Sequence, residues 1–425
     1  MKRALLWLLM VLVFTALVLG GALGFFYYST DEDRLPAAGV TFAGQSLAEA
    51  AGYHWELPVL GGVLWREFSL SPSLANLELE PVTTPSATLE LSADMTADGT
   101  TLTLKTAGGV TVFDGTASEW KNFTFPQNGE YYLTIRAGRQ ASSQKPSKPV
   151  GYYQYQCHFW VDVQPTLTLA SDQAAQGDVA AIYVSGALGA GGTPPTARCE
   201  LGPVWFRPTQ NGWVGYLPVT YNAEGGEWPI TVTLGDVTLS ATLTVRSTEY
   251  PSTQTSSGEA ATAEANEEFR RVIWSLYDQG SNEALWTGAF QYPAQGASIF
   301  QSYGAYLYDG ERSAGRAANL TLLTPENALA VSPAAGRVAY AGKLQLTGNT
   351  VVIDHGCGVK SYLFGLSSIA DIKTGDEVTA GQGLGVAGRK LIWEVRIGNK
   401  SVDPQKLTQR GSNGLFYRPV GDELR

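Results

Sequence analysis

The chain has 425 residues, of which 44% are hydrophobic and 16% charged, and its formal net charge is -10. This length allows about two to four domains. Such an acidic chain lacks the basic surface that nucleic-acid binding requires, and anionic wall polymers would repel it. The three cysteines are an odd number, which excludes a full disulfide framework. Two readings stay open: a single Cys157–Cys199 bridge, or buried free thiols only.

An uncharged apolar run occupies residues 4–27, directly after Lys2 and Arg3. As a helix it would be about 35 Å long, enough to cross a hydrocarbon core of about 30 Å. The acidic residues 31–33 follow the run, so the positive-inside rule predicts a cytoplasmic N-terminus and an extracytoplasmic bulk. A cleaved signal peptide is the alternative, although its apolar region is usually shorter. We predict a single-pass anchor in the cell membrane over residues 1–30.

The next part of the chain favours β-structure. Residues 31–80 show no regular pattern and predict a stalk with an irregular entry into the first domain. Short alternating strands separated by glycines and aspartates fill residues 81–163 and again residues 164–248. Both segments contain a turn, an acidic residue, an aromatic residue and then an alternating strand, at 128–135 and 225–232. This order resembles a late strand of the immunoglobulin fold, so we expect two immunoglobulin-like β-sandwich domains.

Residues 249–284 combine a Ser-, Thr- and Ala-rich linker with a predicted amphipathic helix over 259–278. Gly280 would end this helix. Its apolar residues recur at i, i+3, i+4, i+7 and i+8 and form one stripe: Phe269, Val272, Ile273, Leu276 and Tyr277. We predict that the stripe packs on the following domain; docking on a partner protein is the alternative.

The last large segment consists of hairpin-like strands separated by glycines. Its recognisable pieces are 290–293, 300–304, 332–342, 348–356, 372–382, 385–388, 393–397 and 402–404. In order and spacing they resemble the lysostaphin/LytM-type metallopeptidases, peptidase family M23. The resemblance implies a hairpin-rich, barrel-sandwich-hybrid-like β-domain over residues 285–410, followed by a tail over 411–425. Residues 176–245 also resemble a β-sandwich often found upstream of this domain.

Active members of that family bind zinc through a His-x-x-x-Asp motif and the second His of a His-x-His motif. The first His of the His-x-His motif and one further His assist the attacking water. The resemblance places Ala317 and Thr321 at the first motif, Gly365 at the assisting His, and Lys390 and Ile392 at the His-x-His pair.

These five residues do not form a zinc site. Zinc requires nitrogen, oxygen or sulfur donors and an open position for the water that it activates. The entire chain has three histidines, His54, His158 and His355, and only the last lies in this segment. We expect His355 to be a hydrogen-bonded residue at a strand end. The resemblance therefore implies a degenerate member without catalytic residues, zinc or another cofactor.

The sequence as a whole predicts a mainly β protein that is anchored in the membrane by its N-terminal helix. The interpretation is a non-catalytic binding module of the cell envelope, acting as a scaffold or regulator of peptidoglycan remodelling. Its partner would be an envelope protein or a peptidoglycan peptide, bound in a groove at Lys390, Ile392 and Trp393. The alternative is an active peptidoglycan metallo-endopeptidase that uses an unrecognised site.

The predicted topology is tested by protease treatment of cells stripped of their wall. Because the charges around residues 4–27 place the bulk of the chain outside, added protease should digest the C-terminal domain. Immunoblotting against that domain measures the loss, and a cytoplasmic protein is the control that must survive. Full protection of the C-terminal domain in intact cells would contradict the prediction.

Overall fold

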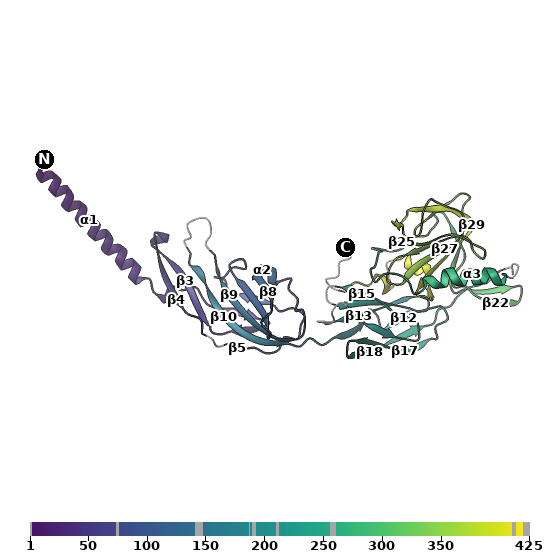
Figure 1. The fold of residues 1–425 in the computed structure, drawn as a ribbon, viewed down its shortest axis with the longest axis horizontal. Coiled ribbons are helices and arrows are strands. Elements are labelled where there is room, and N and C mark those ends of the chain that lie inside the picture. The colour runs from purple at the N-terminus through teal and green to yellow at the C-terminus, as the bar shows by residue number, and fades with distance from the viewer. Residues whose placement is uncertain are drawn as a thin grey trace. The chain divides into compact units, whose positions relative to one another are not determined.

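The structure is a computed structural model that describes residues 2–73, 76–140, 148–186, 188, 193–209, 212–255, 261–409 and 414–419. Strands hold 46% of the residues and helices 15%, which confirms the predicted β class. The chain divides into two compact units, Met1–Gln164 and Pro165–Arg425. Each unit is described by itself (Figure 1).

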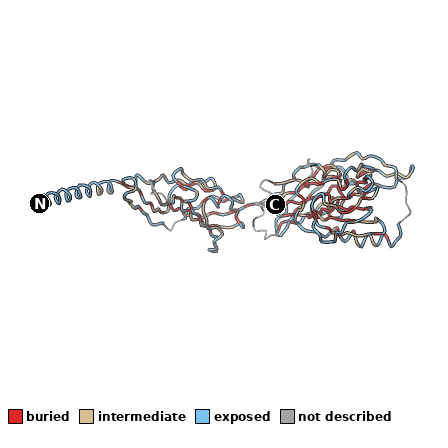
Figure 2. Tube along the Cα trace, turned by 90° about the horizontal axis from the view of Figure 1, so that it is seen from above, coloured by how far each residue is buried: buried red, intermediate tan, exposed pale blue. Residues whose placement is uncertain are grey.

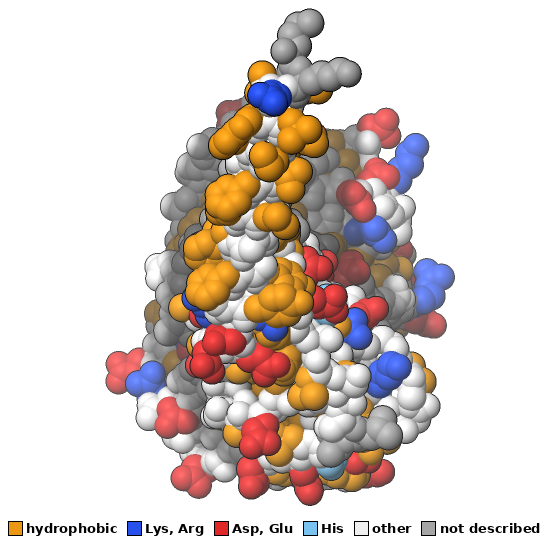
Figure 3. Space-filling model, turned by 90° about the vertical axis from the view of Figure 1, so that its left-hand side faces the viewer, with side chains coloured by type: hydrophobic (Ala, Val, Ile, Leu, Met, Phe, Trp, Pro, Cys, Tyr) orange, Lys and Arg blue, Asp and Glu red, His pale blue; other side chains and the backbone are white. Residues whose placement is uncertain are grey.

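The first element is the helix α1 (Lys2–Ser29). Its large apolar side chains are exposed, with 74% of Leu5 and 70% of Leu17 accessible. Figure 2 shows the helix exposed along almost all of its length, and hydrophobic side chains cover the face of it seen in Figure 3. By length and composition α1 is able to cross a membrane, and the same features fit a signal sequence.

Two sheets build the rest of the first unit. The smaller has the strand order β2-β1-β6, and the larger has the order β4-β3-β10-β9-β7-β8, with β5 also paired to β10. The elements are η1 (Glu32–Arg34), β1 (Val40–Phe42), β2 (Gln45–Leu47), β3 (Gly52–Val59), η2 (Leu60–Gly62), β4 (Leu64–Leu70), β5 (Leu77–Glu78), β6 (Leu89–Leu91), β7 (Thr101–Thr106), β8 (Thr111–Thr116), α2 (Ala117–Trp120), β9 (Gly129–Arg139) and β10 (Val150–Val161).

Aromatic side chains fill the space between these two sheets. Phe42 of β1 lies 5.1 Å from Phe159 of β10 and 5.8 Å from Trp120 of α2, measured between ring centroids. Phe125 and Tyr131 extend the cluster, and all five side chains are at most 2% exposed. Aromatic pairs at this spacing add to the stabilisation from buried area, so this cluster holds the small sheet on the large one.

Within residues 31–80, predicted as a stalk with an irregular entry into the first domain, the structure places β3 and β4 in the larger sheet of the first unit. Strand β3 pairs antiparallel with β10, with Trp55 opposite Gly151, and β4 pairs with β3. Trp55 is fully buried. The first folded unit therefore begins before residue 81, because its sheet recruits strands that are distant in sequence from their partner β10.

The second unit begins with two four-stranded sheets, ordered β11-β13-β16-β15 and β12-β18-β17-β14. One buried apolar cluster, which includes Ile182, Leu217 and Ile230, contains residues from both sheets. This two-sheet arrangement is a β-sandwich; its immunoglobulin-like topology stays a prediction. The strands are β11 (Thr166–Leu169), β12 (Gln173–Ala175), β13 (Val179–Ser185), β14 (Thr196–Arg198), β15 (Trp205–Thr209), β16 (Gly212–Pro218), β17 (Gly226–Leu234) and β18 (Val237–Arg246).

A nine-stranded sheet follows, with the order β20-β23-β29-β27-β26-β25-β28 and with β24 and β30 paired to β29. The strands β19, β21 and β22 form a separate small sheet. The elements are β19 (Ser252–Gln254), α3 (Ala263–Ile273), η3 (Trp274–Leu276), β20 (Ser298–Gln301), β21 (Tyr306–Asp309), β22 (Arg312–Arg316), β23 (Leu320–Leu323), β24 (Leu329–Val331), β25 (Gly336–Leu344), β26 (Gly348–Asp354), β27 (Val359–Ile369), β28 (Glu377–Val378), β29 (Gly383–Ile397), β30 (Lys400–Val402), α4 (Pro404–Leu407) and η4 (Gly414–Phe416).

The predicted helix forms as α3 and continues into η3. Its start is set by Thr262, whose hydroxyl accepts the N–H of Ala265 as an N-cap. Part of the helix predicted over 259–278 falls on residues 259 and 260, which lie outside the described residues.

The sandwich and the large sheet of the second unit share a core. Tyr216 of β16 lies 5.5 Å from Trp286, and both side chains are fully buried. The Trp286 indole N–H donates to the carbonyl of Leu415 in η4 at 3.4 Å. Leu415, within the segment predicted as a tail over 411–425, is itself fully buried in this core.

Replacing Trp286 tests this shared core. The Trp286→Ala change should lower the free energy of unfolding by about 3–5 kcal/mol, because it removes the buried ring and leaves a cavity. Trp274→Ala is the matched control, since 52% of that side chain is exposed, and it should cost less than about 1 kcal/mol. Urea unfolding followed by circular dichroism measures both changes; equal losses would contradict the shared core.

Candidate functional site

The long strand β29 gives the large sheet two different faces. Its odd-numbered side chains from Leu391 to Ile397 are fully buried in the main core of the second unit. Because successive side chains on a strand point to opposite faces, the even-numbered ones line the other face. We call this other face the motif face; it consists of Lys390, Ile392, Glu394 and Arg396 of β29 with Tyr362 and Phe364 of β27.

Strand pairing gathers most of the predicted site positions at this face. Thr321 of β23 lies directly opposite Ile392 of β29, and Phe364 of β27 flanks Ile392 on the other side. Gly365 lies at an irregularity in the β27–β29 pairing. A Cβ atom at Gly365 would be 3.0 Å from the carbonyl oxygen of Lys390. Four of the five positions are therefore neighbours.

Ala317 is the fifth position, and it lies in the turn before β23. Its N–H donates to the carbonyl of Ala305 at 3.0 Å, while its own carbonyl accepts the N–H of Gly304 at 2.8 Å. Its side chain is 2% exposed. A buried methyl group fixed by two backbone hydrogen bonds stabilises this turn and provides no metal ligand.

The remaining side chains are engaged in contacts other than metal binding. The Thr321 hydroxyl donates to Asn319 Oδ1 at 3.4 Å, and the Lys390 ammonium lies 4.2 Å from the ring centroid of Phe300. Gly365 has a φ of 78°, a left-handed conformation that a histidine would adopt only with strain. Within the described ranges, no group of three His, Cys, Asp or Glu side chains is placed to hold a metal ion together.

Two further predictions concerned Trp393 and His355. Trp393 does not line the groove: it points to the main core, where its indole N–H donates to Ser361 Oγ at 3.3 Å, since it is one residue out of phase with Ile392. His355 is the buried strand-end residue expected, with its ring nitrogens 2.8 Å from the Ala335 carbonyl oxygen and 2.9 Å from Ser361 Oγ.

The helix α3 covers the motif face. The sequence predicted that this helix packs on the following domain, but not that it packs on this face. The apolar stripe of α3 and η3 does pack on the following domain, as the periodicity indicates. Ile273 and Leu276 are buried in one cluster with Tyr362 and Phe364, and Ile392 packs against this cluster. Phe269 lies 6.1 Å from Phe364, and Tyr277 lies 6.3 Å from Tyr362, between ring centroids. Figure 1 shows α3 beside strands of the large sheet.

A buried ion pair lies at the same face, and sequence reasoning missed it. Glu394 Oε1 lies 2.6 Å from a terminal nitrogen of Arg396. Burial raises the pKa of the Glu394 carboxyl, and the guanidinium partly offsets this. The Arg396 guanidinium carbon also lies 5.0 Å from the Tyr277 ring centroid. The alternation of residues 392–396 signals two faces, but only the position of α3 shows that this one is buried.

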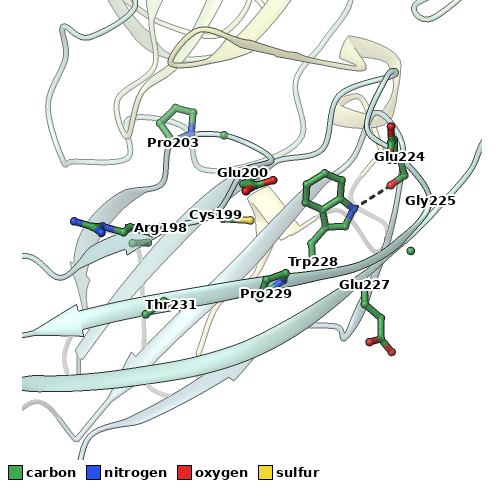
Figure 4. A pocket seen from close by; sticks show the side chains of 13 residues that line it. Arg198, Cys199, Glu200, Pro203, Glu224, Gly225, Glu227, Trp228, Pro229 and Thr231 are labelled. Carbon is green, nitrogen blue, oxygen red and sulfur yellow. Dashed lines mark hydrogen bonds between the residues drawn. The ribbon is translucent and has the colours of Figure 1, made fainter.

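The sandwich of the second unit carries a separate open cleft of about 860 Å³. Figure 4 shows the Trp228 indole between Glu200 and Glu224, with its N–H directed to the Glu224 carbonyl at 3.0 Å. Cys199 also lines the cleft, and burial raises the pKa of its thiol. All three cysteines are free in the structure. No predicted site position lines this cleft.

Comparison with known proteins identifies the domain that carries the motif face. Residues 318–404 match the model of peptidase family M23, so this part of the chain is an M23 domain, of a family related to the cell wall. No curated protein matches the chain.

Several solved structures are similar to parts of the chain. A protein from Pseudomonas aeruginosa described as a peptidase M23 is 22% identical, with 55% of this chain and 94% of that one covered and a TM-score of 0.42. The catalytic domain of lysostaphin from Staphylococcus simulans is 19% identical over 26% and 92%, with a TM-score of 0.24. The SpoIIIAH–SpoIIQ complex contains a chain that is 16% identical over 28% and 98%, with a TM-score of 0.23.

Burial of His355 makes the stability of the M23 domain depend on pH. Burial lowers the pKa of His355 from 6.5 to about 4. Between these values the unfolded chain binds more protons than the folded one, so stability is complete above about pH 6.5 and falls toward pH 4. Urea unfolding at pH 7 and pH 5 should show a loss of about 2 kcal/mol from this residue.

The variant His355→Gln isolates that contribution, because it cannot titrate. The drop in the free energy of unfolding from pH 7 to pH 5 should be smaller in this variant than in the native chain by about 2 kcal/mol. His54→Gln is the control, since His54 lies in the first unit and should leave the second unit unchanged. The same drop in His355→Gln as in the native chain would contradict the prediction.

Proposed function

We propose that the chain is a membrane-anchored, non-catalytic binding module of the cell envelope, a scaffold or regulator of peptidoglycan remodelling. Its M23 domain is then a pseudoenzyme. The observation that carries the proposal is the set of residues at the five family positions: Ala317, Thr321, Gly365, Lys390 and Ile392. A methyl group, a hydrogen atom and a branched hydrocarbon have no donor atoms, and an ammonium group would repel the cation.

The surroundings of these residues support the same conclusion. Ile392 packs against the apolar cluster beneath α3, so it presents hydrocarbon where a zinc-bound water would need polar partners. A catalytic zinc site keeps one coordination position open to water and substrate. An apolar floor that packs against a helix is suited to protein contact and not to hydrolysis.

The end of α1 supports an anchor that remains attached. The Arg66 guanidinium of β4 donates to the carbonyls of Tyr27 at 3.1 Å and Tyr28 at 3.0 Å, close to the C-terminus of the helix. A cation suits this position because the last carbonyls of a helix lack partners and carry partial negative charge. Cleavage within the end of α1 would remove these contacts, so the proposal keeps α1 as the anchor and the bulk of the chain outside.

Part of the surface beside α3 is accessible. The edge strand β20 carries Ile299 and Phe300, which are 40% and 39% exposed, and Lys390 is exposed next to them. An ammonium group over an aromatic ring offers a charge to a carboxylate and an apolar surface beside it. Both a peptidoglycan peptide and an acidic segment of an envelope protein have this chemistry.

Metal content tests the proposal directly. The full-length protein, purified in detergent without chelator, should contain far less than one zinc per chain by elemental analysis, because the five positions supply no donor set. The same preparation should release no fragments from purified peptidoglycan.

The opposite result would be about one zinc per chain that is lost in the Thr321→Ala variant. Thr324→Ala is the matched control, since Thr324 lies just after the same strand and its hydroxyl donates to the Gly388 carbonyl, away from the predicted positions. Zinc that survives in Thr324→Ala and disappears in Thr321→Ala would overturn the non-catalytic interpretation and restore the metallo-endopeptidase.

A further inference from the structure

The cover that α3 and η3 provide leaves buried polar groups unpaired. The Tyr362 hydroxyl and the Arg396 Nε have no hydrogen-bond partner among the residues that the structure describes. The covering residue above them is Tyr277, whose ring packs near both side chains. An aromatic ring is a weak acceptor for these donors, and unpaired buried donors raise the free energy of the covered state.

Few polar contacts hold the cover in place. At one end the Glu268 carboxylate accepts the backbone N–H of Gln345 at 2.7 Å. At the other end the Lys360 ammonium donates to the Gln279 carbonyl. The rest of the contact is the apolar stripe. Eleven residues are too few for a stable isolated helix in water, so α3 is ordered only while its stripe is docked.

After the covering segment the chain passes through Gly280 and is then held to the M23 domain by backbone hydrogen bonds. Gly280 has a φ of 134°, in the range that favours glycine, directly after the covering segment. Beyond it the N–H of Cys357 donates to the Ser281 carbonyl at 2.7 Å, and the N–H of Leu285 donates to the His355 carbonyl at 2.9 Å. The helix is therefore able to swing about Gly280 while the chain after it stays fixed.

We propose that α3 with η3 is an internal ligand of the motif face, which a partner protein replaces with an amphipathic helix of its own. This rests on the proposed function, since a binding module needs a surface that it can offer. The partner helix carries large apolar side chains at i, i+3, i+4 and i+7, as α3 and η3 do. At i+8, where the chain has Tyr277, it carries a neutral acceptor such as Gln, because Glu394 already places a carboxylate beside Arg396. This acceptor pairs with the Tyr362 hydroxyl and the Arg396 Nε.

Hydrogen exchange of the full-length native protein in detergent tests whether the cover opens by itself. Amides of α3 should exchange at least about 10-fold faster than those of β27 and β29, on which the helix packs, because α3 opens without unfolding the sheet. Mass spectrometry of peptic fragments measures the three segments. Equal protection in α3 and the two strands would make the helix part of the fixed core and overturn the proposal.

A peptide with the sequence of residues 261–280 then serves as the partner helix. Labelled with a fluorophore, it should bind the Val272→Ser/Leu276→Ser chain, whose own helix is weakened, and bind the native chain at least about 10-fold more weakly. The matched control chain is Arg270→Ser/Arg271→Ser, which changes the helix outside the stripe and should behave as the native chain. Fluorescence anisotropy measures each affinity.

Variant peptides test the chemistry of the face. A peptide with Ile273→Asp should not bind, since it breaks the stripe, and a peptide with Tyr277→Gln should bind more tightly than the native sequence. The proposal would be overturned if the Ile273→Asp peptide bound with the same affinity as the native peptide, or if no peptide bound. If a peptidoglycan stem peptide, and not the helix peptides, speeds exchange in α3, the face binds wall peptide and the helical partner is wrong.

These outcomes are separate from the test of the proposed function. Zinc in the purified protein would refute the non-catalytic interpretation while leaving the exchange and anisotropy results as measured. Conversely, a chain without zinc whose α3 is as protected as β29 would remain a pseudoenzyme, with a motif face that is closed permanently.

Discussion

Alternation along β29 is the constraint from which both the core and the site of the second unit follow. The strand pairs with β23, β24, β27 and β30, so its geometry fixes the register of the whole M23 sheet. Every odd-numbered side chain from Leu391 to Ile397 packs into the core that also contains Tyr216 of the sandwich. The even-numbered side chains have no access to that core and need a different cover.

The helix α3 is that cover, and the residues at the family positions suit it. An imidazole at position 392 would present polar nitrogens to the apolar cluster beneath α3, whereas Ile392 presents a hydrocarbon that packs against it. Burying polar groups without partners costs free energy, so a helix of this kind packs well only on a face without metal ligands. The apolar Ile392 and the helix that packs beside it are thus two parts of one packing arrangement.

The sequence allowed prediction of elements whose pattern is local. The stripe from Phe269 to Tyr277 predicts a helix, and glycines between alternating strands predict the hairpins of the M23 domain. The strand β3 was not predicted because its residues do not alternate, and because it depends on pairing with β4 and with β10, which is far along the chain. Strand alternation puts Trp393 on the opposite face from Ile392, so the predicted groove could not contain both side chains. The cleft at Trp228 depends on loops whose approach no sequence pattern encodes.

The two ends of α3 limit what displacement can achieve. Before the helix, β19 pairs in parallel with β21, with Ser252 opposite Tyr306, so the chain is held there. After the helix, the backbone contacts of Ser281 and Leu285 hold it again. A released α3 therefore stays tethered close to the motif face, and the high effective concentration of a tethered ligand favours its return. A partner must compensate for this with contacts that α3 lacks, and Arg396 and Tyr362 are the groups that offer them.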